Sequence, residues 1–234
     1  MTENTIYKNY LYISKKKFVL SILQPENFKK IYEEEIFFEN NLSIIEFDKL
    51  DYFLEKKIYK VEKKIGSFIK DISIIYESPD IFSIDVSIKN NNNGNFLNNA
   101  SLSRPLLDAR EAFLQSLGDN RIIHMFIKNY KVDKKDYSCL PKNLKCEYFS
   151  LDIRFICIPY YMIKVLEDRM KKFQISIDKI LSSNYLKSFF NDSEKDLFFW
   201  ALRIDNGYNE NEVKFNKKTQ KNKGFFEKFF NFFS

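Results

Sequence analysis

RIIHMFIKNYKVD, residues 121–133, is the stretch of this sequence from which its fold can be worked out. Every second side chain shares one face: Ile122, His124, Phe126, Tyr130 and Val132. A period of two is the signature of a β-strand, whose successive side chains point to opposite faces. Because the pattern continues to Tyr137, we predict a strand over residues 121–137 that turns back into another.

Further elements follow from the same kind of pattern on both sides of this strand. Upstream we predict two short strands within residues 10–23, a third over 30–39, a long amphipathic helix over 46–70, strands over 72–76 and 81–88, an asparagine-rich loop over 90–99, and a helix over 103–117. Ser103 is the expected cap of this last helix, with Pro105 in its first turn and Gly118 at its end. Downstream we predict a strand over 146–158, a helix over 160–172 opened by Pro159, a strand over 175–181 and a short helix over 197–204. The chain is therefore expected to be α+β.

Composition limits the class of protein. A chain of 234 residues can bury a core as one large domain or two small ones. We expect neither a membrane-spanning helix nor a signal peptide, because no run approaches 18 apolar residues and the first residues are polar. Cys139, Cys146 and Cys157 form no CxxC pair and lie in or near apolar strands, so we expect buried, reduced thiols in a cytoplasmic body.

No motif for catalysis is found. The single histidine, His124, lies in an apolar strand, and we expect it to be partly buried with one hydrogen bond. The sequence contains no Walker loop, no GxGxxG and no HExxH. We therefore expect no enzyme activity, no catalytic or cofactor-binding residues, no metal site and no cofactor.

The C-terminal end has the composition of a membrane anchor. From Lys214 onward there are six lysines and one acid, Glu227, which gives +5 of the net charge of +6. Over residues 224–234 the phenylalanines occupy one side of a helix and the polar residues the other. The expected membrane-binding residues are Phe225, Phe226, Phe229, Phe230, Phe232, Phe233, Lys217, Lys218, Lys221, Lys223 and Lys228. The alternative is a terminal helix docked on its own domain. Because the excess charge lies beside this helix and not on a folded face, we expect no nucleic-acid binding.

Residues 121–133 also carry a resemblance to a known family. They resemble the "ri.Hvip..y.vDg" stretch of the actin-like bacterial cell-division protein FtsA. The residues from Leu140 to Ile158 look like the family's next strand, and those from Tyr160 to Asp178 look like its return to the main sheet. The resemblance runs in register over about 65 residues. The hairpin near Leu11 and the C-terminal helix are similar to the family's first hairpin and membrane-targeting sequence.

The resemblance implies a partial actin-like (ribonuclease H-like) first lobe over residues 1–99 and an SHS2 β-α-β-β domain over 100–190. It further implies a short helical return segment over 191–207, a flexible lysine-rich linker over 208–223 and the amphipathic helix over 224–234. Two departures matter. The family's "iDiGtsk" phosphate loop is replaced by Tyr12-Ile-Ser14, without the aspartate and the glycine, and the second actin lobe is absent. We therefore expect neither ATP binding nor direct FtsZ binding.

These observations predict a non-catalytic, FtsA-like cell-division scaffold. Its SHS2 part would bind division proteins or self-associate, and its tail would hold it peripherally on anionic lipid at the cytoplasmic face of the inner membrane. The expected partner-binding residues are Arg110, Phe113, Ile122, His124, Phe126, Tyr130 and Asp133, on the helix 103–117 and on a sheet edge over 122–133. The alternatives are a degenerate actin-family ATPase that still binds nucleotide, and a membrane adaptor unrelated to division.

Overall fold

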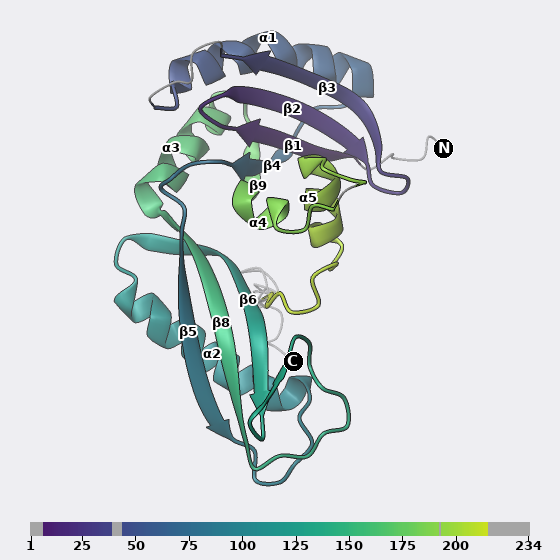
Figure 1. Ribbon diagram of the computed structural model, residues 1–234. Coiled ribbons are helices and arrows are strands. Elements are labelled where there is room, and N and C mark those ends of the chain that lie inside the picture. Colours follow the sequence, from purple (N-terminus) through teal and green to yellow (C-terminus); the bar gives the residue numbers. More distant parts are fainter. Residues whose placement is uncertain (1–6, 39–43, 192, 215–234) are drawn as a thin grey trace, which may run out of the picture.

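The described residues fold into two β-sheets that are joined end to end (Figure 1). The structure, a computed structural model, describes residues 7–38, 44–191 and 193–214. The first sheet holds β1 (Lys8–Ile13), β2 (Lys17–Gln24), β3 (Lys29–Phe37), β4 (Asp71–Tyr76) and β9 (Ser176–Ser182), in the order β3-β2-β1-β4-β9. The second sheet holds β5 (Phe82–Asn91), β6 (Asn120–Val132), β7 (Lys135–Tyr137) and β8 (Tyr148–Pro159), in the order β5-β8-β6-β7. The helices are α1 (Phe47–Ile65), α2 (Asn99–Ser116), α3 (Tyr160–Lys171), α4 (Ser183–Lys187) and α5 (Leu197–Asp205). The predicted α+β class is confirmed.

The first sheet is the middle layer of three. Strands β1, β2 and β3 form an antiparallel meander, whereas β4 runs parallel to β1 and β9 runs parallel to β4. One face packs on α1 and α3, and the opposite face packs on α4 and α5. Because both faces are covered, β2 is buried along nearly its whole length, which explains its continuous apolar run.

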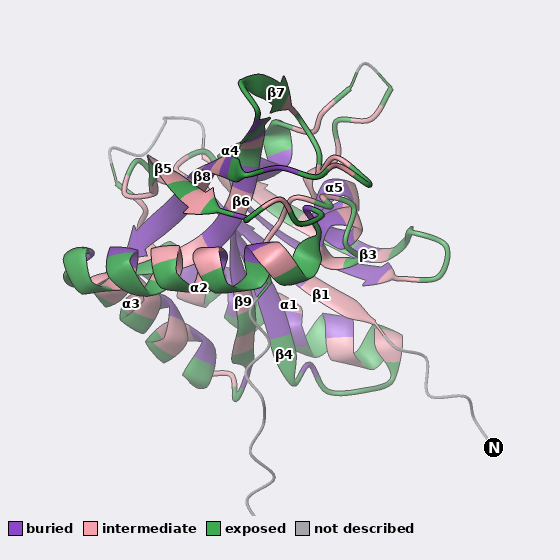
Figure 2. Cartoon of the chain, turned by 90° about the horizontal axis from the view of Figure 1, so that it is seen from below, coloured by how far each residue is buried: buried purple, intermediate pink, exposed green. Residues whose placement is uncertain are grey.

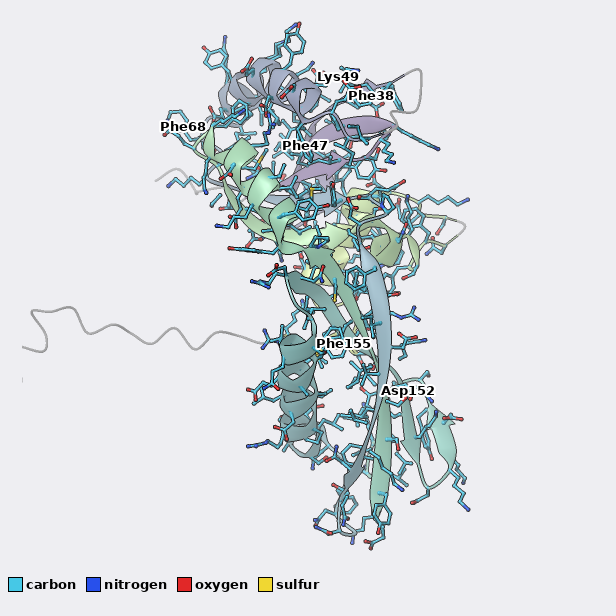
Figure 3. The ribbon with its side chains drawn as sticks, turned by 90° about the vertical axis from the view of Figure 1, so that its left-hand side faces the viewer. Phe38, Phe47, Lys49, Phe68, Asp152 and Phe155 are labelled. Carbon is cyan, nitrogen blue, oxygen red and sulfur yellow. The ribbon has the colours of Figure 1, made fainter. Side chains whose placement is uncertain are left out.

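The second sheet is covered on one face only. Phe155 of β8 stacks on Phe113 of α2, with ring centroids 4.2 Å apart. Figure 3 shows Phe155 on the side that faces α2 and Asp152 on the opposite side. The outer side carries mostly polar residues, and in Figure 2 β5 is coloured as exposed or intermediate where the central strands are buried.

The chain enters the second sheet from β4 and returns to the first through α3 and β9 (Figure 1). Because β5 pairs with β8 along its full length, the second sheet begins at Phe82 and not near residue 100 as expected. The expected loop over 90–99 is shorter, since β5 continues to Asn91 and α2 begins at Asn99.

Two helix boundaries differ from those expected, and one helix was not predicted. The first helix ends at Ile65 because Gly66 adopts a left-handed backbone with φ 72° and donates its amide to the carbonyl of Glu62 at 2.8 Å. The cap of α2 is Asn98, not Ser103, because Asn98 and Ser101 form a reciprocal capping box. Pro105 consequently lies inside the helix. The short helix α4 was not expected at all.

The expectation of three buried thiols was wrong for one of them. Cys146 and Cys157 are buried and free, but Cys139 is exposed and free in the loop after β7. The predicted amphipathic helix over 224–234 and most of the linker lie outside the described residues.

Candidate functional site

The junction of the two sheets is built around His124. Its ring is buried on β6, and its Nδ1 lies 3.0 Å from Oε1 of Glu212. Its Nε2 accepts a hydrogen bond from the backbone amide of Ser182 at 3.1 Å. These partners assign the ring proton to Nδ1. His124 therefore has two hydrogen-bond partners, where one was expected, and links β6, the end of β9 and the C-terminal segment.

Aromatic packing surrounds this histidine. The ring of Tyr185, on α4, lies 4.3 Å from the ring of His124 and 5.2 Å from that of Phe126, measured between centroids. The Tyr185 hydroxyl accepts a hydrogen bond from the side-chain amide of Asn209 at 2.8 Å. Burial raises the pKa of Tyr185 above its ordinary value, and the charge of Glu212 adds to this shift. Most polar atoms of the cluster contact one another, as in a structural joint, but Oε2 of Glu212 is buried without a hydrogen-bond partner among the described residues.

The C-terminal segment 209–214 lies along the edge of β6. The amide of Ile127 donates to the carbonyl of Asn211 at 3.0 Å, and the amide of Val213 donates to the carbonyl of Met125 at 2.8 Å. An antiparallel bridge joins Phe126 to Glu212. The middle of the edge that we expected to be open over residues 122–133 is thus occupied by the chain itself, and β7 pairs with its end.

A cavity of about 360 Å³ lies beside this joint, between β6, β9 and the end of α5. Two of its charged lining residues, Lys179 and Asp205, form an ion pair. Asp205 accepts hydrogen bonds from the hydroxyl of Tyr10 at 2.9 Å and from Nζ of Lys179 at 2.8 Å. Lys214, the last described residue, donates to the backbone carbonyl of Ile204 at 3.1 Å. The contact of Lys214 holds the last described residues against α5.

The turn between β1 and β2 is the segment that the sequence resemblance compared with a phosphate loop. The hydroxyl oxygen of Ser14 accepts hydrogen bonds from the amides of Lys16 at 3.2 Å and Lys17 at 3.1 Å. A phosphate loop needs such amides free for the ligand. Here the turn uses two of them internally.

A second cavity of about 480 Å³ adjoins this turn. Lys15, Lys16 and Glu77 are among its lining residues. Burial alone would raise the pKa of Glu77, but hydrogen bonds from Lys187, Tyr12 and Ser183 outweigh burial and lower it. The Tyr12 hydroxyl donates at 2.7 Å and the Ser183 hydroxyl at 2.9 Å. Glu77 therefore joins β1, β4 and α4.

The predicted partner-binding residues do not share one surface. Phe113, His124 and Tyr130 are buried in the body, where Tyr130 donates to Asn211 at 3.2 Å. Ile122, Phe126 and Arg110 are half-buried, and Arg110 lines the junction cavity. Asp133 is exposed in the turn between β6 and β7, with φ 49°.

The outer face of the second sheet carries a charged network that sequence reasoning missed. Asp85 of β5 accepts two hydrogen bonds from the guanidinium of Arg154, at 2.6 and 2.7 Å, and one from Lys128 at 2.9 Å. The hydrogen bonds from Arg154 are the main reason why the pKa of Asp85 lies well below its usual range. Asp152 pairs with Lys131 at 3.0 Å on the same face. Alternation along β5 could have indicated an exposed face, but not which charges would meet.

The described ranges contain neither a cluster of metal ligands nor a membrane-spanning helix. Residues 7–38, 44–191 and 193–214 contain no group of three or more His, Cys, Asp or Glu residues that could hold a metal ion. No helix within them is both long and apolar enough to cross a membrane. The predicted membrane-binding phenylalanines and lysines, from Lys217 to Phe233, lie outside these ranges.

Comparisons with known proteins give structural similarity at low sequence identity. No family model matches the sequence. No curated protein matches it. The cytoplasmic domain of EpsL, an inner membrane component of the type II secretion system of Vibrio cholerae, is 10% identical with a TM-score of 0.36, and the match covers 77% of this chain and 57% of that one. The PilM-PilN type IV pilus biogenesis complex is 5% identical with a TM-score of 0.46, over 79% of this chain and 50% of that one.

A third solved structure, a Bacteroides thetaiotaomicron protein with an actin-like ATPase fold and unknown function, is 16% identical with a TM-score of 0.32. This match covers 80% of the present chain and 57% of the other. The chain thus spans about half the length of these three structures. The solved structures similar to it include a protein with an actin-like ATPase fold, a component of a secretion system and a pilus biogenesis complex.

Proposed function

We propose that this chain is a non-catalytic scaffold that holds partner proteins at the cytoplasmic face of a bacterial inner membrane. The observation that carries this proposal is the exposure of the second sheet. It extends away from the first sheet, with α2 on one face and a polar face on the other (Figures 1 and 3). Such a surface suits a protein partner better than a small substrate, which prefers a concave, mostly apolar site.

The attachment to a membrane rests on the C-terminal sequence. The lysine-rich and phenylalanine-rich residues begin where the described body ends, at Lys214 beside the junction cavity. Each half-inserted phenylalanine would contribute about 1 kcal/mol, below the full burial value, and each nearby lysine up to about 1 kcal/mol on anionic lipid. A tail of this kind would bind reversibly.

A role in cell division is the finer part of the proposal. It is supported by the resemblance of residues 121–133 to the FtsA family and by the element order β5-α2-β6-β7-β8, which, apart from the three-residue β7, is the β-α-β-β order of an SHS2 domain. In this proposal the second sheet binds other division proteins. A pull-down from the host with the chain that carries Phe226→Glu and Phe230→Glu tests this part. Recovery of proteins from another process would favour an adaptor unrelated to division.

Liposome flotation tests the attachment. We expect the intact chain to float with vesicles that contain anionic lipid, and Phe226→Glu with Phe230→Glu to abolish flotation. The matched control is Phe68→Glu, because Phe68 is 80% exposed on the body and receives the same substitution. Flotation that survives the double substitution would show that the tail is not the anchor.

Nucleotide binding is the second candidate, because the cavity of about 480 Å³ beside Lys15 and Lys16 lies next to the β1–β2 turn. Two amides of this turn bind Ser14 instead, which weighs against a phosphate there. Titration of the chain with ATP in a calorimeter separates the candidates. A saturable heat of binding would favour the degenerate ATPase over the scaffold.

A further inference from the structure

Strand β5 is the regular open edge of the second sheet. Its ten residues pair one to one with β8, without a register shift, from Phe82 opposite Cys157 to Asn91 opposite Tyr148. Across the described parts of the chain, β8 is the one strand that pairs with β5. An edge of this kind presents unpaired backbone groups that another strand can bind.

The other long edge differs in this respect. Strand β3 has a register shift near Tyr32, which interrupts its regular pairing with β2. Bulges of this kind are one way in which proteins protect a sheet edge. The charges of β3 are also paired within the chain, as in Lys57 with Glu34 and Lys17 with Glu35.

The charges on β5 have a spacing that suits a second copy of the same strand. Asp85 and Lys89 lie on the outer face, two residues on either side of Ser87. If two β5 strands pair antiparallel around a two-fold axis beside Ser87, Asp85 of each copy lies opposite Lys89 of the other. On the other face, Val86 then lies opposite Ile88. A two-fold interface requires this kind of self-complementarity, in which residue i meets j and j meets i.

Both charged side chains have room for such a contact. The side chain of Asp85 is 45% exposed although it binds Arg154 and Lys128. Lys89 makes no ion pair with the described residues, and its Nζ lies 5.0 Å from the ring centroid of Tyr148. Val86 and Ile88 are only half-buried against the core that includes α2. A second strand would cover these apolar groups and supply an acid to each Lys89.

We propose that two copies of this chain associate through antiparallel β5–β5 pairing, centred on Ser87, into one continuous sheet. Each interface has two Asp85–Lys89 cross-strand ion pairs and two Val86–Ile88 contacts. Cross-strand pairs of these types stabilise sheets, and like charges directly opposite each other destabilise them. The association does not depend on the tail, so its failure would leave membrane attachment untouched.

A charge exchange between two variants tests the pairing by sedimentation velocity on the full-length chain. Asp85→Lys alone places lysine opposite lysine twice, and Lys89→Asp alone places aspartate opposite aspartate twice. Each variant should self-associate about tenfold or more weakly than the parent, a loss of about 1.4 kcal/mol. An equimolar mixture of the two should recover a dimer with one chain of each kind, because both pairs are then opposite in charge.

Two controls keep the outcome decisive. Lys60→Asp makes the same charge change on an exposed position of α1 and should leave the dimer unchanged. The same variants are also measured in a chain that carries Phe226→Glu and Phe230→Glu. This distinguishes association through β5 from association through the tail. If Asp85→Lys fails to fold, the self-association of Lys89→Asp, compared with that of Lys60→Asp, still tests the pairing. A monomeric parent, a dimer lost with the tail, or equal dimerisation of Lys89→Asp would each overturn the proposal.

Discussion

The imidazole of His124 and the carboxylate of Glu212 lie 3.0 Å apart although 88 residues separate them in the sequence. Their contact holds the C-terminal segment 209–214 against β6 at the place where the two sheets meet. The side chains are nearly inaccessible, at 2% and 8% exposure. Because both side chains are buried, removal of one partner is expected to lower the free energy of unfolding.

Removal of Glu212 should weaken the fold. Glu212→Ala leaves Nδ1 of His124 buried without an acceptor, which costs about 1–3 kcal/mol of unfolding free energy. Urea denaturation measures the loss, and limited proteolysis should cut more readily within residues 209–214. Glu210→Ala is the matched control, since Glu210 is exposed and should change stability by less than about 0.5 kcal/mol. Equal stability of the two variants would contradict a role for the pair.

The cap of α2 can be located by two substitutions. Asn98→Ala removes the side chain that accepts the amide of Ser101 at 3.0 Å and should cost about 1 kcal/mol. Ser103→Ala should be nearly neutral, because the Ser103 hydroxyl binds the carbonyl of Asn99 within the helix at 2.8 Å. Thermal unfolding followed by circular dichroism compares them. A larger loss from Ser103→Ala would place the cap where the sequence predicted it.

Acid should act on the outer face of the second sheet through Asp85. The Arg154 guanidinium holds the pKa of this carboxyl well below its unfolded value of about 3.9. The folded state thus binds fewer protons, and the stabilisation is present above the unfolded pKa and is lost as the pH falls through the folded pKa. Asp85→Asn should therefore lose less stability than the parent between about pH 5 and pH 2.

Urea midpoints across that pH range check this prediction. Because Asp85 is partly exposed, the difference between variant and parent should shrink at about 1 M salt. Parallel pH curves for the two proteins would show that the Asp85–Arg154 pair does not contribute.

The three thiols should react at different rates. Cys139 is exposed, whereas Cys146 and Cys157 are buried, and burial raises the pKa of Cys157 to about 11. A thiol reagent should label one cysteine quickly in the native chain and all three in urea. Cys139→Ser should abolish the fast phase, and Cys157→Ser should leave it intact. Rapid labelling of the Cys139→Ser variant would mean that a buried thiol is accessible.

Much of the fold could be predicted because local pattern determines it. Alternation of apolar residues identified the strand at residues 121–133. Pro159 and the apolar residues at helical spacing after it identified the helix α3. The helix α4 was not predicted because its five residues are too few to show a helical period in the sequence. Ser103 was predicted as the cap of α2, and residues 90–99 were predicted as a loop, whereas the structure places the cap at Asn98, in a reciprocal capping box with Ser101.

The candidate site was harder to predict because it depends on long-range pairing. Nothing local to His124 indicates Glu212, and nothing local to Asp85 indicates that Arg154 lies opposite it, 69 residues away. The edge at β6 was expected to be open, yet a segment near the end of the body covers it. Conversely β5 was recognised as a strand but not as an edge, because strand order is a property of the assembled sheet.

The late arrival of β9 has a consequence for synthesis on the ribosome. Strand β4 pairs in parallel with β9, with Tyr76 opposite Ser182, so the first sheet cannot be completed until the whole second sheet has been translated. At about 5–20 residues per second, the roughly 100 residues between these strands take about 5–20 s to emerge. During that interval the edge of the nascent β4 that later pairs with β9 has unpaired backbone groups, which can pair with a wrong strand. Slow or paused translation across this interval should therefore increase the need for chaperones.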